Sequence, residues 1–257
     1  MPVDDPEVVA ALAAAISAPR TDAPRHRLVG ALTVAGDTAS ASFVRGQLVS
    51  ASLRRNLGRP NPQLEADLSR EVPPDPLARR VLDPVLAWPG ADRVVWGRGL
   101  PERITVPARR FFEDGALLRQ RMPLTDLTVR DYARVGPEFF DLPWLAGLRT
   151  FALAPTRFGL ADLEALIASP FLTELRVLAL SNLGLPPEAL AMLVNAPSIA
   201  RVRYLRLDGN AFLDPNPPAP GAVSRMAAVI VRARGRPAWL PGFAVGFAPP
   251  SEALDAG

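Results

Sequence analysis

The spacing of hydrophobic residues divides the chain into two parts with different periods. In the first part, apolar side chains recur at helical intervals, as at Val9, Leu12 and Ile16. Asp5 is a typical helix N-cap, and Pro19 ends this first run. Asp22 precedes a second helical stretch that Gly36 closes, and a third stretch, TASASFVRGQLVSASLRR, follows it. The pattern predicts a helical domain over residues 1–57.

A polar, proline-rich stretch separates this helical part from the remainder of the chain. The segment RPNPQLEADLSREVPPDP carries few apolar positions, and a short run with helical spacing covers residues 77–86. The sequence therefore predicts a connector over residues 58–99, containing one short helix and a first strand region.

From about residue 100 the chain repeats at an interval of 27 residues. The spacing LxxLxLxxLxL occurs at Leu175, Leu178, Leu180, Leu183 and Leu185. It returns 27 residues later at Val202, Leu205, Leu207, Asn210 and Phe212. It starts 27 residues earlier at Leu148, Phe151 and Leu153, and 24 residues before those at Leu124, Leu127 and Val129. A weaker first copy is formed by Ile104 and Val106.

Each repeated unit combines a strand pattern with a helix pattern. In the LxxLxL half, apolar residues alternate, as they do in a strand with one buried face. In the second half, such as LADLEALIASPF, apolar residues follow at i, i+3 and i+4. One unit cannot cover its own apolar face, so neighbouring units stack and bury a continuous core. The predicted fold is α/β: a short solenoid with parallel strands on the concave side and helices on the convex side, after a small α-helical domain.

These repeats resemble the leucine-rich repeat family, specifically the ribonuclease-inhibitor-like subclass with units of about 27–28 residues. The best match is VRYLRLDGNAF, in which Asn210 takes the family's turn asparagine. Other units have Tyr132, Thr156 and Leu183 at that position. The resemblance implies a leucine-rich-repeat arc with a C-terminal cap over residues 100–247. Residues 248–257 are expected to be a disordered tail.

The N-terminal part is similar to the repeat-companion domain, which precedes leucine-rich repeats in some bacterial proteins. The matching positions are Asp22, Pro24, Arg25, Leu32, Gly36, Asp37, Phe43, Arg45 and Gln47. The chain departs from the usual Ala-Asp-Trp-Leu core of that domain, with Val-Gly-Ala-Leu over residues 29–32. This second resemblance implies an architecture and no particular chemistry.

Composition excludes several kinds of site. The chain has no Cys and one His, and all 29 basic residues are Arg, against 26 acidic residues. There is therefore no disulfide framework, no zinc finger and no P-loop lysine. We predict neither a cofactor nor a metal. The net charge of +3 argues against nucleic acid as a partner. An acidic N-terminus and the lack of an 18-residue apolar run predict a cytoplasmic protein without a membrane partner.

The outward strand positions are the best candidates for function, because Tyr and Arg are enriched in binding hot spots. The candidate partner-binding residues are Asp126, Arg130, Ser181, Tyr204, Arg206 and Asp208. They favour a non-enzymatic protein-interaction module, with the partner and the oligomeric state left open. One alternative is nucleic-acid binding through Arg232, Arg234, Arg236 and Trp239 of the C-terminal cap. A second alternative is a small hydrolase that uses carboxylates and His26.

Overall fold

The structure is a computed structural model that describes residues 5–57, 73–86, 93–186, 188–199 and 201–210. The chain is mixed α/β, and most of its strand pairing is parallel. It divides into two compact units, residues 1–106 with 114–125 and residues 107–113 with 126–257. Among the described residues, no helix combines the length and the apolar character that a membrane span requires.

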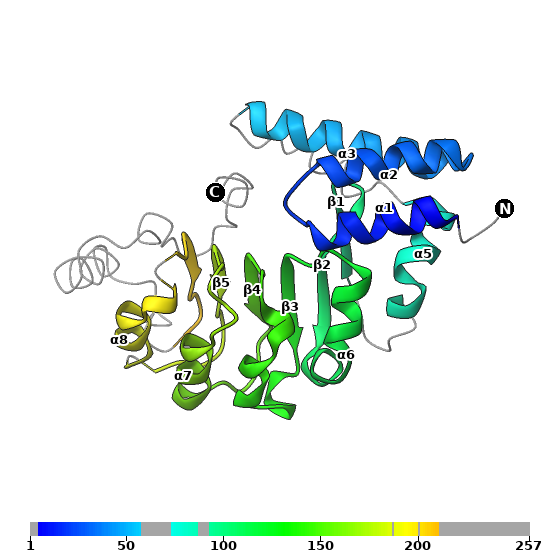
Figure 1. The fold of residues 1–257 in the computed structure, drawn as a ribbon. Helices are drawn as coiled ribbons and strands as arrows, with labels where there is room; N and C mark the ends of the chain where they lie inside the picture. The colour runs from blue at the N-terminus through cyan, green and yellow to red at the C-terminus, as the bar shows by residue number, and fades with distance from the viewer. Residues whose placement is uncertain (1–4, 58–72, 87–92, 187, 200, 211–257) are drawn as a thin grey trace. The chain divides into compact units, whose positions relative to one another are not determined.

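Three helices begin the first unit, where the sequence predicts them: α1 (Pro6–Ser17), α2 (Ala23–Val34) and α3 (Thr38–Leu57) (Figure 1). The Asp5 side chain caps α1 by accepting a hydrogen bond from the Glu7 N–H, at 2.9 Å. Asp22 precedes α2, but its side chain makes no capping hydrogen bond to this helix. Its carboxylate pairs with an arginine instead, as described below.

The first unit continues with α5 (Asp75–Leu86), β1 (Arg93–Gly97) and β2 (Leu100–Pro107). The predicted short helix is therefore confirmed. Strands β1 and β2 form an antiparallel hairpin, which the periodicity of Ile104 and Val106 did not predict. Its two turn residues, Arg98 and Gly99, both have positive φ, as a two-residue hairpin turn of type I′ requires.

Helices and hairpin share the hydrophobic core of the first unit. Buried apolar residues from α1, α2, α3, α5 and the start of β2 form one cluster, which includes Val8, Leu32, Val44, Leu77 and Leu100. The Trp96 ring of β1 packs edge-on against Phe43 of α3, with ring centroids 5.6 Å apart. Gly99 also lies against α3, because a Cβ built on it would meet the Val44 Cα at 2.7 Å.

The described residues of the second unit contain four parallel strands in sequence order: β3 (Asp126–Arg130), β4 (Thr150–Leu153), β5 (Val177–Ala179) and β6 (Tyr204–Arg206). Leu127 pairs with Phe151, Phe151 with Leu178, and Leu178 with Leu205. These intervals of 24, 27 and 27 residues are the intervals of the sequence repeat. Residues at equivalent positions of successive repeats therefore pair with one another across neighbouring strands, and this part of the prediction is confirmed.

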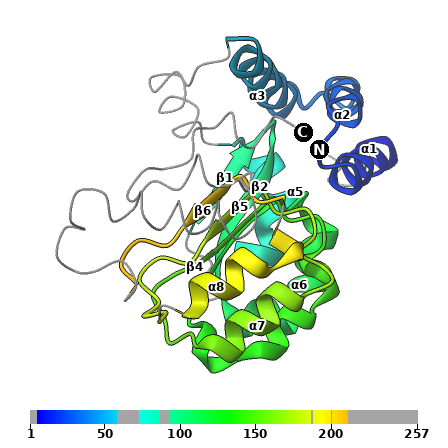
Figure 2. The ribbon, with the colours of Figure 1, turned by 90° about the vertical axis from the view of Figure 1, so that its left-hand side faces the viewer.

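The connections between these strands are not uniform. Helix α7 (Leu160–Ala168) follows β4, and α8 (Glu188–Asn195) follows β5; both lie on the same side of the strands (Figures 1 and 2). The segment between β3 and β4 instead holds three 3₁₀ turns, η1 (Tyr132–Arg134), η2 (Pro137–Asp141) and η3 (Pro143–Leu145). A further turn, η4 (Pro197–Ile199), precedes β6, and α6 (Ala108–Arg121) follows β2.

The core of the second unit contains the repeating apolar positions. The inward residues Leu127, Phe151, Leu178 and Leu205 are each at most 1 % exposed, and Leu180 is fully buried. Next to them lies an aromatic cluster made of Phe111, Tyr132, Phe139, Phe140, Phe151 and Phe158. The segment between β3 and β4, which contains no α-helix, thus contributes aromatic rings as well as leucines to this core.

Candidate functional site

The strand residues that alternate with the buried ones form a surface that we call the outward face. It consists of Asp126, Thr128, Arg130, Thr150, Ala152, Ala154, Val177, Ala179, Ser181, Tyr204, Arg206 and Asp208. All of these residues are partly exposed except Val177, which is 2 % exposed. The predicted alternation of inward and outward side chains is confirmed on β3, β4 and β6.

Three of the six predicted site residues lie together at one corner of the outward face. The Ser181 hydroxyl donates a hydrogen bond to Asp208 Oδ1 at 2.8 Å. The same oxygen forms an ion pair with Arg206 Nε at 3.6 Å, and 34 % of the Arg206 side chain is exposed. Tyr204 precedes Arg206 on the same face of β6. Hydroxyl, carboxylate and guanidinium groups are thus held in position beside a partly exposed tyrosine.

Apart from these three residues and Tyr204, the predicted set contains Asp126 and Arg130, which lie on β3, three strands away from Tyr204 in strand order. Between them the face carries the small side chains of Ala152 and Ala179. The candidate residues therefore form two charged ends on either side of a middle made of uncharged, mostly small side chains.

Asn210 holds the turns that follow β5 and β6. It is 2 % exposed, and its amide group makes four hydrogen bonds. The side-chain NH₂ donates to the carbonyls of Leu180 at 2.7 Å and Leu207 at 2.8 Å. The side-chain oxygen accepts from the N–H groups of Leu183 and Leu185, both at 3.1 Å. One side chain thereby satisfies four backbone groups of two neighbouring units.

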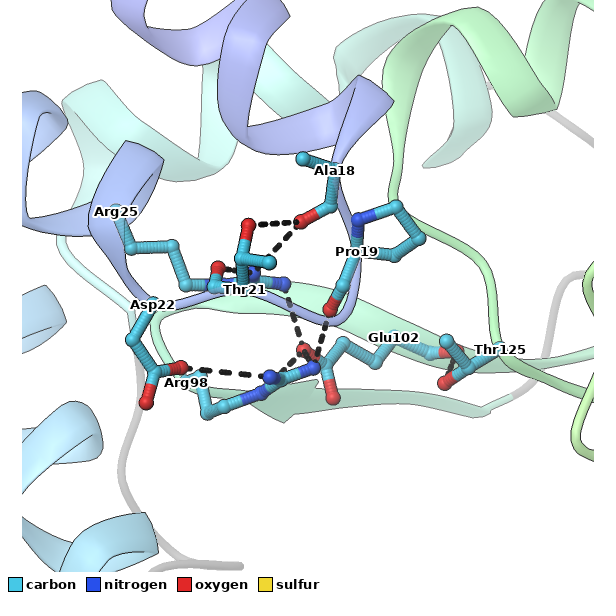
Figure 3. Close-up of polar contacts among 8 residues, drawn as sticks. All are labelled: Ala18, Pro19, Thr21, Asp22, Arg25, Arg98, Glu102 and Thr125. Atoms are coloured by element: carbon cyan, nitrogen blue, oxygen red, sulfur yellow. Dashed lines mark hydrogen bonds and ion pairs between the residues drawn. The ribbon is translucent and has the colours of Figure 1, made fainter. Parts of the chain in front are cut away.

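A buried polar cluster in the first unit was not predicted (Figure 3). Arg25 of α2 is fully buried, and its guanidinium donates to Glu102 Oε1 of β2 at 2.8 Å and to the Thr21 carbonyl at 2.9 Å. Arg98 of the hairpin turn donates to the same Glu102 oxygen at 2.8 Å and pairs with Asp22 at 3.4 Å. We call these four charged side chains the Arg25 cluster.

The Arg25 cluster links the loop between α1 and α2 to the hairpin. Arg98 also donates to the Pro19 carbonyl, and the Glu102 carbonyl accepts the Thr125 N–H at 2.9 Å. Burial lowers the pKa of the Arg25 guanidinium, and the charge of Glu102 opposes that shift. Two cations and two carboxylates balance one another, so the arrangement fits a structural connection.

Other candidate residues do not form a site in the described part of the chain. His26 is exposed on α2. No group of three or more metal-binding side chains occurs among the residues whose positions are described. The predicted nucleic-acid residues Arg232, Arg234, Arg236 and Trp239 lie outside the described residues, as does the expected tail at 248–257.

The buried tyrosine beside α7 has a structural role. The Tyr132 hydroxyl donates to Asp162 Oδ1 at 3.0 Å, while Asp162 Oδ2 accepts the Gly159 N–H at 2.7 Å and caps α7. Burial raises the pKa of the Tyr132 hydroxyl, and the hydrogen bond to Asp162 adds to that shift. Tyr132 therefore stays protonated and orients the carboxylate that caps α7.

Comparisons of this chain with protein-family models, with curated proteins and with solved structures found no match.

Proposed function

We propose that the chain is a non-enzymatic protein-interaction module that binds its partner on the outward face of β3–β6. The observation that carries the proposal is the corner formed by Ser181, Arg206 and Asp208, where polar groups are fixed relative to one another beside a partly exposed Tyr204. Fixed side chains lose little conformational entropy on binding, so more of the contact free energy contributes to affinity.

We also propose that residues 100–247 form a leucine-rich-repeat arc, with the strands on its concave side. Two observations support this assignment: the agreement between sequence period and strand register over β3–β6, and the four hydrogen bonds of Asn210. In such an arc the helices would line the convex side and leave the strand face available to a partner.

In this mechanism Tyr204 and Arg206 anchor the partner by burying large side chains with directed hydrogen bonds. Asp208 at the same corner and Arg130 on β3 would then select a partner of matching charge. The small side chains of the middle strands let the partner approach the backbone closely.

The test begins with proteins that co-purify with the tagged chain from its native cell. Tyr204→Ala should weaken the binding of a purified partner by about 1–3 kcal/mol, measured by calorimetry, and leave the circular dichroism spectrum unchanged. Arg157→Ala with Glu164→Ala, two exposed residues near α7, is the matched control and should bind normally. If the Tyr204→Ala/Arg206→Ala variant retains every partner at full affinity, the proposal is wrong.

A further inference from the structure

The chain contains two Asp-Gly steps, which lie in different surroundings. Asp208 and Gly209 form the turn that follows β6, whereas Asp114 and Gly115 lie inside α6. In an Asp-Gly step the side-chain carboxyl is open to attack by the next main-chain nitrogen, because glycine has no Cβ to hinder the approach. The two steps share this chemistry, so their surroundings decide which of them reacts.

The turn after β6 does not engage the Gly209 nitrogen. Gly209 is exposed and has a φ of 71°, in the left-handed region that favours glycine. Its N–H makes no hydrogen bond to any residue whose position the structure describes. Main-chain pairing therefore does not hold this nitrogen away from the carboxyl group beside it.

The carboxyl group of the same step is held through one of its two oxygens. The Asp208 side chain is 22 % exposed, and its Oδ1 accepts the Ser181 hydroxyl at 2.8 Å and pairs with Arg206 Nε at 3.6 Å. Donors that face one oxygen stabilise the negative charge that develops on it when the carbon is attacked. The other oxygen, Oδ2, has no partner among the described residues and is the one that can leave.

The helix protects the second Asp-Gly step. Gly115 is buried inside α6, and its N–H belongs to the main-chain hydrogen-bond ladder of that helix. To reach the Asp114 carboxyl carbon, this nitrogen must leave the ladder, which breaks a hydrogen bond and interrupts the helix. Reaction at Asp114 therefore requires local unfolding, whereas reaction at Asp208 does not require a helix to open.

We propose that Asp208 is a site of spontaneous isomerisation in the folded protein and that Asp114 is not. The Gly209 nitrogen bonds to Cγ of the protonated Asp208 carboxyl, and the hydroxyl leaves as water together with the amide proton. The product is a five-membered succinimide ring. Water then opens the ring: addition at Cγ restores aspartate, and addition at the main-chain carbonyl gives isoaspartate. One water is lost and one is regained, so the isoaspartate product has the composition of the parent.

Isomerisation changes the Ser181–Arg206 corner and the following turn together. The Asp208 oxygen that contacts Ser181 and Arg206 becomes a neutral amide oxygen. The negative charge moves to the former main-chain carbonyl, which accepts the Asn182 N–H at 2.8 Å. The main chain also becomes one atom longer before Asn210, whose side chain makes four hydrogen bonds. The isomerised chain should therefore unfold at a lower urea concentration than the parent.

The experiment incubates the full chain at neutral pH and maps its peptides by mass spectrometry with electron-transfer fragmentation, which distinguishes isoaspartate from aspartate. Isoaspartate at Asp208 should form about tenfold faster than at Asp114, or more, because opening α6 adds to the barrier at Asp114. In concentrated urea both steps lie in unfolded chain, so the two rates should become similar. Equal rates at the two positions in the folded protein, or reaction at Asp114 alone, would overturn the inference.

Two matched variants sharpen the comparison. Asp208→Asn and Asp114→Asn replace the carboxyl by a carboxamide, from which ammonia leaves instead of water. In the folded chain, Asp208→Asn should release ammonia readily and Asp114→Asn should stay intact; equal release would contradict the proposal. Asp208→Glu moves the carboxyl one carbon farther from the nitrogen and should abolish the product at this step. These readouts concern the chain alone, so they are independent of whether a partner binds the outward face.

Discussion

Replacing Asn210 with Ala tests how the last described strand unit is held to its neighbour. The change removes four hydrogen bonds and leaves the carbonyls of Leu180 and Leu207 and two N–H groups without their partner. Each buried group left unpaired costs about 1–3 kcal/mol, and water entering the vacated space recovers part of that cost. We therefore expect a loss of about 3–5 kcal/mol, a large share of the stability of an ordinary domain.

Urea unfolding followed by far-UV circular dichroism measures this loss. Asn182→Gly is the matched control, because Asn182 is exposed and has a positive φ of 57° that glycine accepts. It should change stability by less than about 0.5 kcal/mol. A loss below about 1 kcal/mol for Asn210→Ala would show that the four bonds do not hold the turns together, and would refute the reasoning.

Asn210→Asp separates hydrogen bonding from the loss of side-chain volume. An aspartate still accepts from the Leu183 and Leu185 N–H groups, but it places a negative charge against two carbonyls that now receive amide hydrogens. At neutral pH it should therefore be at least as destabilising as Asn210→Ala. On acidification the carboxyl introduced by Asn210→Asp gains a proton that it can donate. The stability difference between Asn210→Asp and the parent should therefore become smaller. An unchanged deficit at acidic pH would contradict this explanation.

Three other perturbations test the remaining contacts. Gly99→Ala should cost about 2 kcal/mol or more, because alanine is strained at a φ of 85° and its Cβ would meet the Val44 backbone; a thermal melt measures this. Glu102→Gln should cost about 3 kcal/mol in urea unfolding, since it removes the carboxylate that neutralises the buried Arg25. The pKa of Tyr132 is higher in the native state than its value of about 10 in the unfolded chain. The stability that Tyr132 contributes is therefore complete below about pH 10 and is lost progressively above that pH. Between about pH 9 and 11 the parent should lose more stability than Tyr132→Phe.

Matched substitutions accompany these tests. Gly30→Ala is the control for Gly99, since Gly30 is exposed on α2 and no atom lies within 4 Å of an added Cβ; it should be neutral or stabilising. Glu113→Gln is the control for Glu102, because Glu113 pairs with Arg109 at 2.8 Å on an exposed helix face and should leave the melting temperature unchanged. If the parent and Tyr132→Phe lose the same amount of stability at alkaline pH, that loss does not come from ionisation of Tyr132.

The sequence was sufficient to predict the strands of the second unit and their register. A strand has two faces, so a repeating set of apolar positions defines the buried one, and a constant interval aligns each strand with the next. Leu180 illustrates this: its place in the LxxLxL pattern predicts an inward side chain, and the residue is fully buried. The six candidate site residues were likewise predicted to be outward, and all are partly exposed.

Interactions between residues distant in sequence could not be predicted in the same way. Asp22 precedes a helix in the sequence, but nothing near it indicates that its carboxylate pairs with Arg98 of the hairpin. The hairpin itself had a weak signal, because its turn is Arg-Gly, and the usual residue before such a glycine is Asn or Asp. Between β3 and β4, Pro137 and Pro143 disfavour a continuous helix, which accounts for the 3₁₀ turns found there.

The pairing of Arg25 with Glu102 bridges 77 residues of sequence, and this has a consequence for how the protein is made. The ribosome synthesises the helices of residues 5–57 before it adds Glu102. During that interval the guanidinium must stay hydrated, because burying it without its carboxylate is costly. The N-terminal helices therefore reach their final packing only after the hairpin emerges, so the order of synthesis and the order of folding differ at this end of the chain.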